Sequence, residues 1–230
     1  MILRTLLKRL THRPLKLWAK WYSSQTRNYL YENGSLTSRI KVLPGVFHPA
    51  LFLSTQFLLK YLEKQDLMGL KLLELGCGSG LISVVCAKKG ANVFASDINP
   101  QAVENVKSNA ALNHVEVTAY VSDLFQAIPP QTFDYLVINP PYYPKNATDD
   151  SEKAWFCGEN FEYFDQLFRQ LPTYLHQHSQ IRMILSEDCE LAQIQQIARL
   201  HHFDFELLVS KKVMAEQQLV FGIDYSFSYS

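Results

Sequence analysis

The sequence is poor in cysteine and has no long apolar run. Its four cysteines, Cys77, Cys86, Cys157 and Cys189, lie far apart and form no C-x-x-C pair, so neither a zinc knuckle nor a disulfide framework is indicated. No window contains the roughly 18 apolar residues of a membrane span, and no apolar segment with a small-residue cleavage site follows the N-terminus. We therefore expect a cytoplasmic protein without a membrane span.

Acidic residues are absent from the first 30 positions, which carry seven basic ones: Arg4, Lys8, Arg9, Arg13, Lys16, Lys20 and Arg27. Because the whole chain holds 22 basic and 22 acidic residues, positions 31–230 hold 15 basic and 22 acidic residues. The body is therefore acidic, which argues against a broad phosphate-binding surface on it, whereas the basic arm could supply one. The histidines show no metal-ligand spacing that fits the strand order, so we expect no metal site.

The basic arm has leucines at helical spacing, which predict a helix from Ile2 to about Leu10 that ends before Pro14. A second stretch carries Trp18 and Trp21. Three interpretations stay open for the arm: a docking surface for the substrate, a membrane-surface or targeting segment, and a structural extension packed on the body. Asn33-Gly34 and the extended residues after it predict a small hairpin. We expect residues 1–43 to form this arm and hairpin, and residues 44–230 to form the main domain.

From Lys71 onward, short apolar runs alternate with amphipathic segments. Strands are predicted at residues 71–75, 92–96, 115–120, 133–138, 180–185, 203–210 and 218–225. Helices are predicted at residues 50–63, 81–89, 100–112, 161–176 and 190–201. This alternation is typical of an α/β protein with a parallel sheet and helices on both faces. The short connection between the last two strands predicts an antiparallel pair at one edge.

A glycine-rich turn, residues 76–80, follows the first of these strands and opens a helix. Glycines let a ligand approach the backbone, and the helix N-terminus offers free N–H donors. Asp97 closes the second strand, 21 residues after Gly76, where its carboxylate can accept both hydroxyls of a ribose. The G-x-G-x-G spacing, with an acid two residues before it, favours S-adenosylmethionine over a nicotinamide dinucleotide. The residues expected at this cofactor site are Glu74, Gly76, Cys77, Gly78, Gly80 and Asp97.

Further candidates for cofactor binding stand at the same edge of the sheet. Asp123 and Leu124 follow the third strand, and the Asp123 carboxylate could accept a hydrogen bond from an adenine amino group. Ile98 could pack on the face of the adenine ring, because ligands of open α/β sheets bind at the carboxyl ends of the strands. Thr55, on the helix before the first strand, could reach the methionine end of the cofactor.

The tetrapeptide Asn139-Pro140-Pro141-Tyr142 directly follows the apolar strand that ends at Ile138. Its two prolines lack the N–H groups of a strand ladder, so the tetrapeptide is expected to form a rigid lip over the cofactor. A planar NH2 group is a poor nucleophile because its lone pair is delocalised. The Asn139 side-chain oxygen and the Pro140 carbonyl could accept its two hydrogens, while Pro141 holds the backbone and Tyr142 stacks on the substrate. We expect these four residues to be catalytic.

These motifs, in this order, resemble the class I S-adenosylmethionine-dependent methyltransferases of the small domain group, which includes the HemK-like protein-glutamine methyltransferases. The resemblance covers about residues 44–225 and implies a Rossmann-like, seven-stranded mixed sheet whose last strand is antiparallel. Pro44-Gly45-Val46-Phe47 resembles the opening of related rRNA guanine-N2 methyltransferases. Residues 154–160 resemble a segment that helps to form the substrate pocket of shorter HemK-like enzymes, which makes Trp155 a pocket candidate. His48, just before the helix at residues 50–63, is a second candidate.

We therefore expect an N-methyltransferase that uses S-adenosylmethionine and acts on a planar amide or amine nitrogen. The acidic body favours a protein glutamine side chain, whereas the basic arm keeps a nucleic acid open as the substrate, methylated at adenine N6 or guanine N2. A nicotinamide-dependent oxidoreductase and a non-catalytic binding module are the remaining alternatives. An oxidoreductase would not explain the Asn139–Tyr142 lip, and the intact cofactor loop argues against a non-catalytic module. We expect a monomer.

Overall fold

The computed structural model describes residues 25–34, 36–46, 48–49, 53–148, 152–213 and 216–227. The helix expected between Ile2 and Leu10, and the stretch with Trp18 and Trp21, lie outside these residues. The hairpin predicted from Asn33-Gly34 is confirmed: β1 (Arg27–Asn33) and β2 (Leu36–Val42) pair in antiparallel fashion around Gly34, whose φ is 57°.

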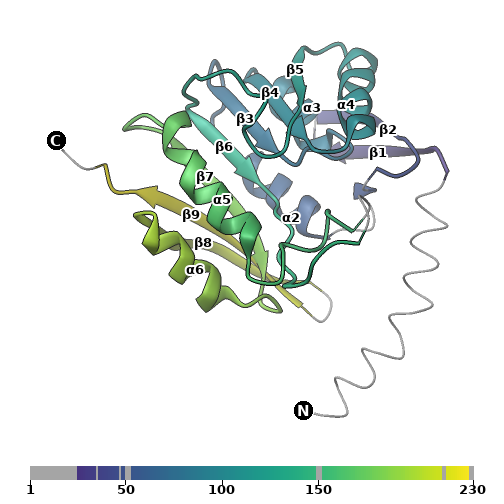
Figure 1. Ribbon diagram of the computed structural model, residues 1–230. Coiled ribbons are helices and arrows are strands. Elements are labelled where there is room, and N and C mark those ends of the chain that lie inside the picture. Colours follow the sequence, from purple (N-terminus) through teal and green to yellow (C-terminus); the bar gives the residue numbers. More distant parts are fainter. Residues whose placement is uncertain are drawn as a thin grey trace.

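A seven-stranded sheet forms the centre of the molecule (Figure 1), in the order β5-β4-β3-β6-β7-β9-β8. Its strands are β3 (Lys71–Leu75), β4 (Asn92–Asp97), β5 (Val117–Val121), β6 (Tyr135–Ile138), β7 (Gln180–Ser186), β8 (Phe203–Val213) and β9 (Glu216–Tyr225). The first five are parallel to one another, and β9 runs antiparallel to both β7 and β8. The seven-stranded mixed sheet with an antiparallel last strand is thus confirmed.

Alternate residues of the central strands face two different hydrophobic clusters. Leu73 and Leu136 belong to the cluster that includes α5 (Glu162–Gln170) and α6 (Leu191–Leu200). Leu72 and Val137 belong to the cluster that includes α2 (Leu53–Leu62), α3 (Leu81–Lys88) and the hairpin. Successive side chains of a strand point to opposite faces, so both faces of the sheet are covered by helices, as expected. In Figure 1, α5 and α6 cover the face toward the viewer.

The β1–β2 hairpin packs on the main body. Tyr31, Ile40 and Val42 are buried in the same cluster as Leu72 of β3. The domain boundary between residues 43 and 44 stays a prediction, but the hairpin shares its core with the central sheet.

Two helices show how local signals set their ends. α4 (Pro100–Leu112) begins where expected, because the Asn99 side chain accepts from the Gln101 N–H and Pro100 occupies the first turn. The helix expected over residues 161–176 is shorter: α5 ends at Gln170, and a 3-10 turn, η2 (Leu171–Tyr174), follows it. Pro172 lacks the N–H that an α-helix would use, which explains the difference. Within the described residues, no helix is long and apolar enough to span a bilayer.

Candidate functional site

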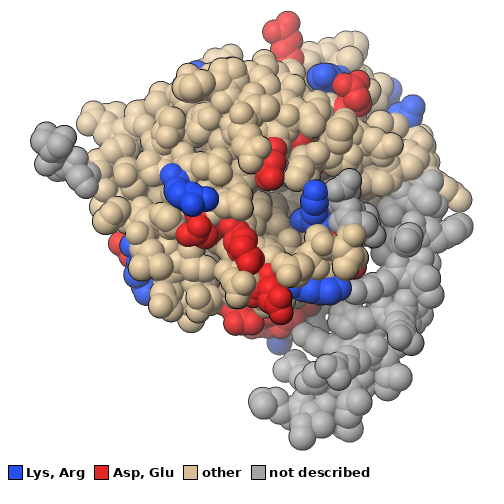
Figure 2. All heavy atoms as spheres, viewed as in Figure 1, with Lys and Arg blue, Asp and Glu red and all other residues tan. Residues whose placement is uncertain are grey.

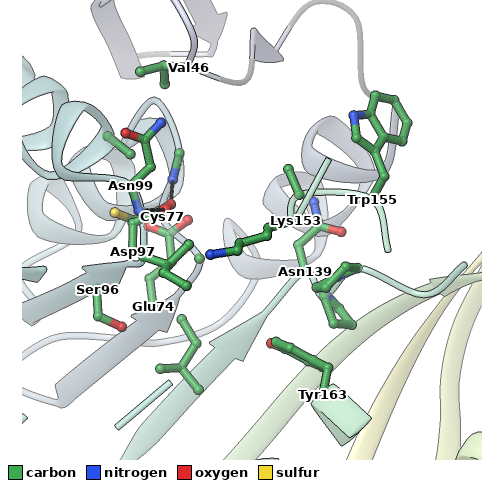
Figure 3. A pocket seen from close by; sticks show the side chains of 18 of the residues that line it. Val46, Glu74, Cys77, Ser96, Asp97, Asn99, Asn139, Lys153, Trp155 and Tyr163 are labelled. Carbon is green, nitrogen blue, oxygen red and sulfur yellow. Dashed lines mark hydrogen bonds between the residues drawn. The ribbon is translucent and has the colours of Figure 1, made fainter. Parts of the chain in front are cut away.

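A cavity of about 390 Å³ opens at the carboxyl ends of the parallel strands. β3 pairs with β4 on one side and with β6 on the other, so the chain order reverses at this point. Open α/β sheets bind ligands at such a position, and the volume is in the usual range for a small-molecule site. The surface is hollowed near the centre of the face shown in Figure 2, and Figure 3 shows the side chains around the cavity.

The glycine loop between β3 and α3 forms one wall of the cavity. Gly76, Gly78 and Gly80 have φ values of 75°, 49° and 75°, in the left-handed region that favours glycine. The Gly76 and Cys77 N–H groups donate to the Ser96 carbonyl at 2.9 and 3.0 Å. A Cβ added to Gly76 would meet no other atom within 4 Å, so the backbone is open to a ligand at this point.

Asp97 lies at the end of β4 and is fixed by backbone donors. Its Oδ2 accepts from the Gly78 N–H at 2.9 Å, and its Oδ1 accepts from the Asn99 N–H at 2.9 Å. Each oxygen can accept one more hydrogen bond, which fits two neighbouring ribose hydroxyls. Burial raises the pKa of Asp97, although the backbone hydrogen bonds act in the opposite direction.

Glu74 and Cys77 are buried beneath the glycine loop. Glu74 is only 4% exposed, and its Oε2 accepts from the Ser83 N–H at 2.9 Å and from the Ser83 hydroxyl. Burial raises the pKa of Glu74 to about 8. Burial also raises the pKa of the Cys77 thiol, so this thiol stays protonated and is unsuited to act as a nucleophile.

Asp123 and Leu124 offer a matched acceptor and donor at the end of β5. Within the described residues, neither the Asp123 carboxylate nor the Leu124 N–H has a hydrogen-bond partner. An adenine ring presents an amino donor beside a ring-nitrogen acceptor, so this pair fits its edge. Leu124 has a φ of 48°, an unusual value for leucine that is often associated with binding sites. Ile98 also lines the cavity, and the donor set therefore fits an adenosine-containing cofactor such as S-adenosylmethionine.

The lip follows β6 and overhangs the cavity opposite the glycine loop. Asn139 Nδ2 donates to Ser54 Oγ at 3.4 Å and to Thr55 Oγ1 at 3.3 Å, both on α2. Its Oδ1 makes no hydrogen bond to any described residue. Tyr142 also lines the cavity and packs against Tyr143, with ring centroids 4.8 Å apart.

Tyr163 and Lys153 are among the cavity residues that were not anticipated from the sequence. Tyr163, near the start of α5, lines the cavity, and burial and the nearby Asp123 and Asp97 raise its pKa. Lys153 extends from the segment after the lip toward Asp97 and Glu74 (Figure 3). Lys153 lies next to the segment that had marked Trp155, whereas no local pattern distinguishes Tyr163 from the other aromatic residues of α5.

The expected site residues are mostly brought together. The lining residues include all four of the lip, the expected strand-end residues, Thr55 and Trp155, and the expected glycine-loop residues other than Gly80, which packs against Val106 instead. His48 is placed differently: it is buried, its ring lies edge-on to Tyr29 with centroids 5.9 Å apart, and it is not among the residues that line the cavity. Its pocket role, like the other residue roles, stays a prediction. No three His, Cys, Asp or Glu side chains in the described part of the chain form a group that could hold a metal ion.

Comparison with known proteins places the chain among methyltransferases. Residues 37–194 match the family "Methyltransferase small domain". A relative from Methanocaldococcus jannaschii, named as a candidate protein N5-glutamine methyltransferase, is 38% identical over 157 residues, which cover 64% of this chain and 76% of the relative. Ribosomal RNA small subunit methyltransferase C of Haemophilus influenzae is 28% identical over 200 residues, which cover 86% of this chain and 53% of that protein. The chain spans only 38% of a matching ribosomal protein L11 methyltransferase from Thermotoga neapolitana.

Two solved structures share the fold. The 16S rRNA N2 G1207 methyltransferase of T. thermophilus, in complex with AdoMet and guanosine, superposes with a TM-score of 0.64 at 20% identity, over 88% of this chain and 51% of that one. The Mtq2–Trm112 complex of E. cuniculi superposes with a TM-score of 0.61 at 20% identity, over 79% of this chain and 99% of that one. Because that neighbour was solved with a second protein, the expectation of a monomer stays a prediction.

The family match, the strand order and the cavity agree with one another. The match covers more than half of the chain and includes the glycine loop, Asp97, Asp123 and the lip. The chain belongs to the methyltransferase small domain family and is an S-adenosylmethionine-dependent methyltransferase.

Proposed function

We propose that the protein transfers a methyl group to the planar nitrogen of a protein glutamine side chain. The observation that carries the proposal is the orientation of Asn139. Its Nδ2 is engaged by the Ser54 and Thr55 hydroxyls, so its Oδ1 is left to accept a hydrogen bond at the cavity. An acceptor at this point suits an NH2 group, which needs hydrogen-bond acceptors and not donors.

The lip residues act by positioning. When bound, S-adenosylmethionine would supply a methyl group carried on a sulfonium, with S-adenosylhomocysteine as the leaving group, and the substrate nitrogen would lose one proton to solvent. Asn139 Oδ1 and the Pro140 carbonyl each accept one hydrogen of the substrate NH2 group, which aligns its nitrogen and stabilises the positive charge that develops there. Pro141 restricts the backbone that aims the Pro140 carbonyl. Tyr142 offers a flat aromatic surface for the planar substrate group.

The charge around the lip favours a polypeptide substrate. The Glu216 carboxylate lies close enough to Tyr142 to add to the rise in pKa that burial causes in its phenol. Burial raises the pKa of the Cys157 thiol to about 11, and the nearby Glu162 and Glu190 carboxylates contribute to the rise. Acidic side chains form a row below the hollow in Figure 2. A phosphate backbone would be repelled at this rim, whereas a polypeptide would not.

A nucleobase amino group is the second candidate. The relative of H. influenzae is named as a ribosomal RNA methyltransferase and matches over 86% of this chain. Gly45 and Val46, from the segment that resembles rRNA guanine-N2 methyltransferases, line the cavity. The basic residues of positions 1–30 could supply the contacts to phosphate that the acidic rim does not.

The substrate class can be tested by labelling. The purified protein is incubated with a cell lysate and S-adenosylmethionine that carries a tritiated methyl group, and the products are digested with protease or with nuclease. We expect the label in protein, released by exhaustive proteolysis as N5-methylglutamine that mass spectrometry identifies. Label recovered as N2-methylguanosine or N6-methyladenosine would contradict the proposal and support the second candidate.

The role of the lip is tested in the same assay with Asn139→Ala. We expect methyl transfer to fall by about 100-fold or more, because the reacting nitrogen loses its orientation and the charge stabilisation. The matched control is Asn92→Ala, which removes an exposed amide at the start of β4, at the opposite end of the strands from the cavity. This variant should transfer the methyl group at the normal rate. Full transfer by Asn139→Ala would refute the mechanism.

A further inference from the structure

Two asparagines of α4 and a third that caps its C-terminal end lie four residues apart and are buried: Asn105 and Asn109 are 0% exposed and Asn113 is 8% exposed. Each side-chain oxygen accepts a hydrogen bond from a backbone N–H of the hairpin segment. Asn113 accepts from Arg39 at 3.0 Å and Asn109 from Lys41 at 2.8 Å. Asn105 accepts from Leu43, also at 2.8 Å.

The same three amides donate back to the hairpin. Asn105 and Asn109 donate to the Lys41 carbonyl, and Asn113 donates to the Arg39 carbonyl. Four residues of a helix rise about 6 Å, and two residues of a strand rise about 6.6 Å. The two spacings match closely, so the three asparagine side chains bond to the backbone of the hairpin segment much as a neighbouring strand would.

Asn109 has one contact that the other two asparagines lack. Its Nδ2 also donates to the Ser79 carbonyl at 2.8 Å, and Ser79 belongs to the glycine loop. The Ser79–Gly80 peptide is held at its other end as well, because the Gly80 N–H donates to the Cys77 carbonyl at 2.8 Å. With its oxygen and both of its amide hydrogens engaged, Asn109 joins three segments: α4, the hairpin and the loop.

A second contact of α4 supports the same junction. A Cβ added to Gly80 would lie 2.8 Å from Val106 Cγ2 and 3.0 Å from Val106 Cα, so the helix packs directly on the loop backbone. Val106 and Asn109 are three residues apart and therefore share one face of the helix. The hairpin also continues into Gly45, which lines the cavity and accepts a hydrogen bond from Asn99.

We propose that Asn109 is a positioning residue for the cofactor. It fixes the Ser79–Gly80 peptide and thereby the shape of the glycine loop that faces the cavity, and it makes this shape depend on the β1–β2 hairpin. Asn109 does not line the cavity, so its effect on the cofactor is transmitted through the loop.

The test compares Asn109→Ala with Asn113→Ala. Both variants lose two hydrogen bonds to the hairpin, but only the first loses the bond to Ser79. The Kd for S-adenosylhomocysteine is measured by calorimetry well below the melting temperature of each variant. We expect Asn109→Ala to raise the Kd about tenfold, which corresponds to the loss of about 1.4 kcal/mol, and Asn113→Ala to leave it within about twofold of the unsubstituted protein.

Hydrogen exchange gives a readout that does not depend on the ligand. In the ligand-free protein, Asn109→Ala should speed the exchange of the Gly78 and Gly80 amides, and Asn113→Ala should not. If an alanine variant does not fold, the same comparison is made with Asn109→Ser and Asn113→Ser, which keep one hydroxyl at each position. An equal rise in Kd for both members of the pair, or an unchanged Kd for the Asn109 variant, would overturn the proposal.

Discussion

Glu74 is predicted to make the stability of the ligand-free protein fall as the pH rises. Its carboxyl is 4% exposed, and burial raises its pKa from 4.5 to about 8 in spite of the two hydrogen bonds from Ser83. The neighbouring Asp97 contributes to this rise in pKa. The protonated form is therefore favoured in the folded protein around neutral pH.

The size and sign of the effect follow from the two pKa values. Below pH 4.5 the Glu74 carboxyl is protonated in both states and contributes no pH dependence. Between pH 4.5 and about 8 the unfolded chain is ionised while the folded protein keeps its proton, so the free energy of unfolding falls as the pH rises. At about 1.4 kcal/mol for each pKa unit, the loss amounts to roughly 5 kcal/mol when it is complete above pH 8.

The assay is urea unfolding of the ligand-free protein, followed by circular dichroism at several pH values from 5 to 8.5. Glu74→Gln cannot titrate, so the variant should escape the loss. We expect the free energy of unfolding of Glu74→Gln, relative to the unsubstituted protein, to rise by several kcal/mol across this range. The control for the change in net charge is Glu104→Gln, which removes an exposed carboxylate on α4 that pairs with Lys107.

A difference that stays flat between pH 5 and 8.5 would refute the reasoning about Glu74. It would mean that the folded protein ionises Glu74 at least as readily as the unfolded chain does, so that the Ser83 hydrogen bonds offset or outweigh burial.

Two further predictions concern the loop and the lip. In thermal unfolding, Gly80→Ala should destabilise the protein by more than Gly34→Ala. Both alanines would have a positive φ, but only the alanine at position 80 would also overlap Val106, which adds about 1–3 kcal/mol to the loss in the free energy of unfolding. Equal losses for the two variants would contradict the close contact between Gly80 and Val106. The double variant Ser54→Ala, Thr55→Ala should lower kcat about tenfold and leave the Kd for S-adenosylhomocysteine within about twofold of the unsubstituted value. The reason is that the two hydroxyls hold the side-chain amide of Asn139. A raised Kd with an unchanged kcat would show that the hydroxyls bind the cofactor instead.

Much of the fold could be predicted because its signals are local. Short apolar runs between amphipathic segments predicted the strands, and their alternation with helices predicted the parallel sheet. α4 was predicted at both ends, since Asn99 and Pro100 form a helix start that depends on neighbouring residues alone. The error at α5 was also local, because the expected helix continued through Pro172. The motifs of the site were predictable because strand ends of a parallel sheet converge on one edge.

The remaining part of the site depends on contacts between distant segments. Tyr163 reaches the cavity because α5 packs across the sheet, and the asparagines of α4 resemble a solvated helix face until the hairpin covers them. Asn109 bonds to Lys41, 68 residues away in the chain, and to Ser79, 30 residues away.

The strand and helix pattern, the cofactor loop and the rigid lip can be predicted from the amino-acid sequence, because they are set by backbone preferences and by residue types at short spacing. The contact of the Ser54 and Thr55 hydroxyls with Asn139, and the buried amide that joins the hairpin to the loop, depend on the packing of the fold. A hydrogen bond requires two groups to meet within about 3 Å, and for segments far apart in the chain that meeting is set by the packing of the whole fold.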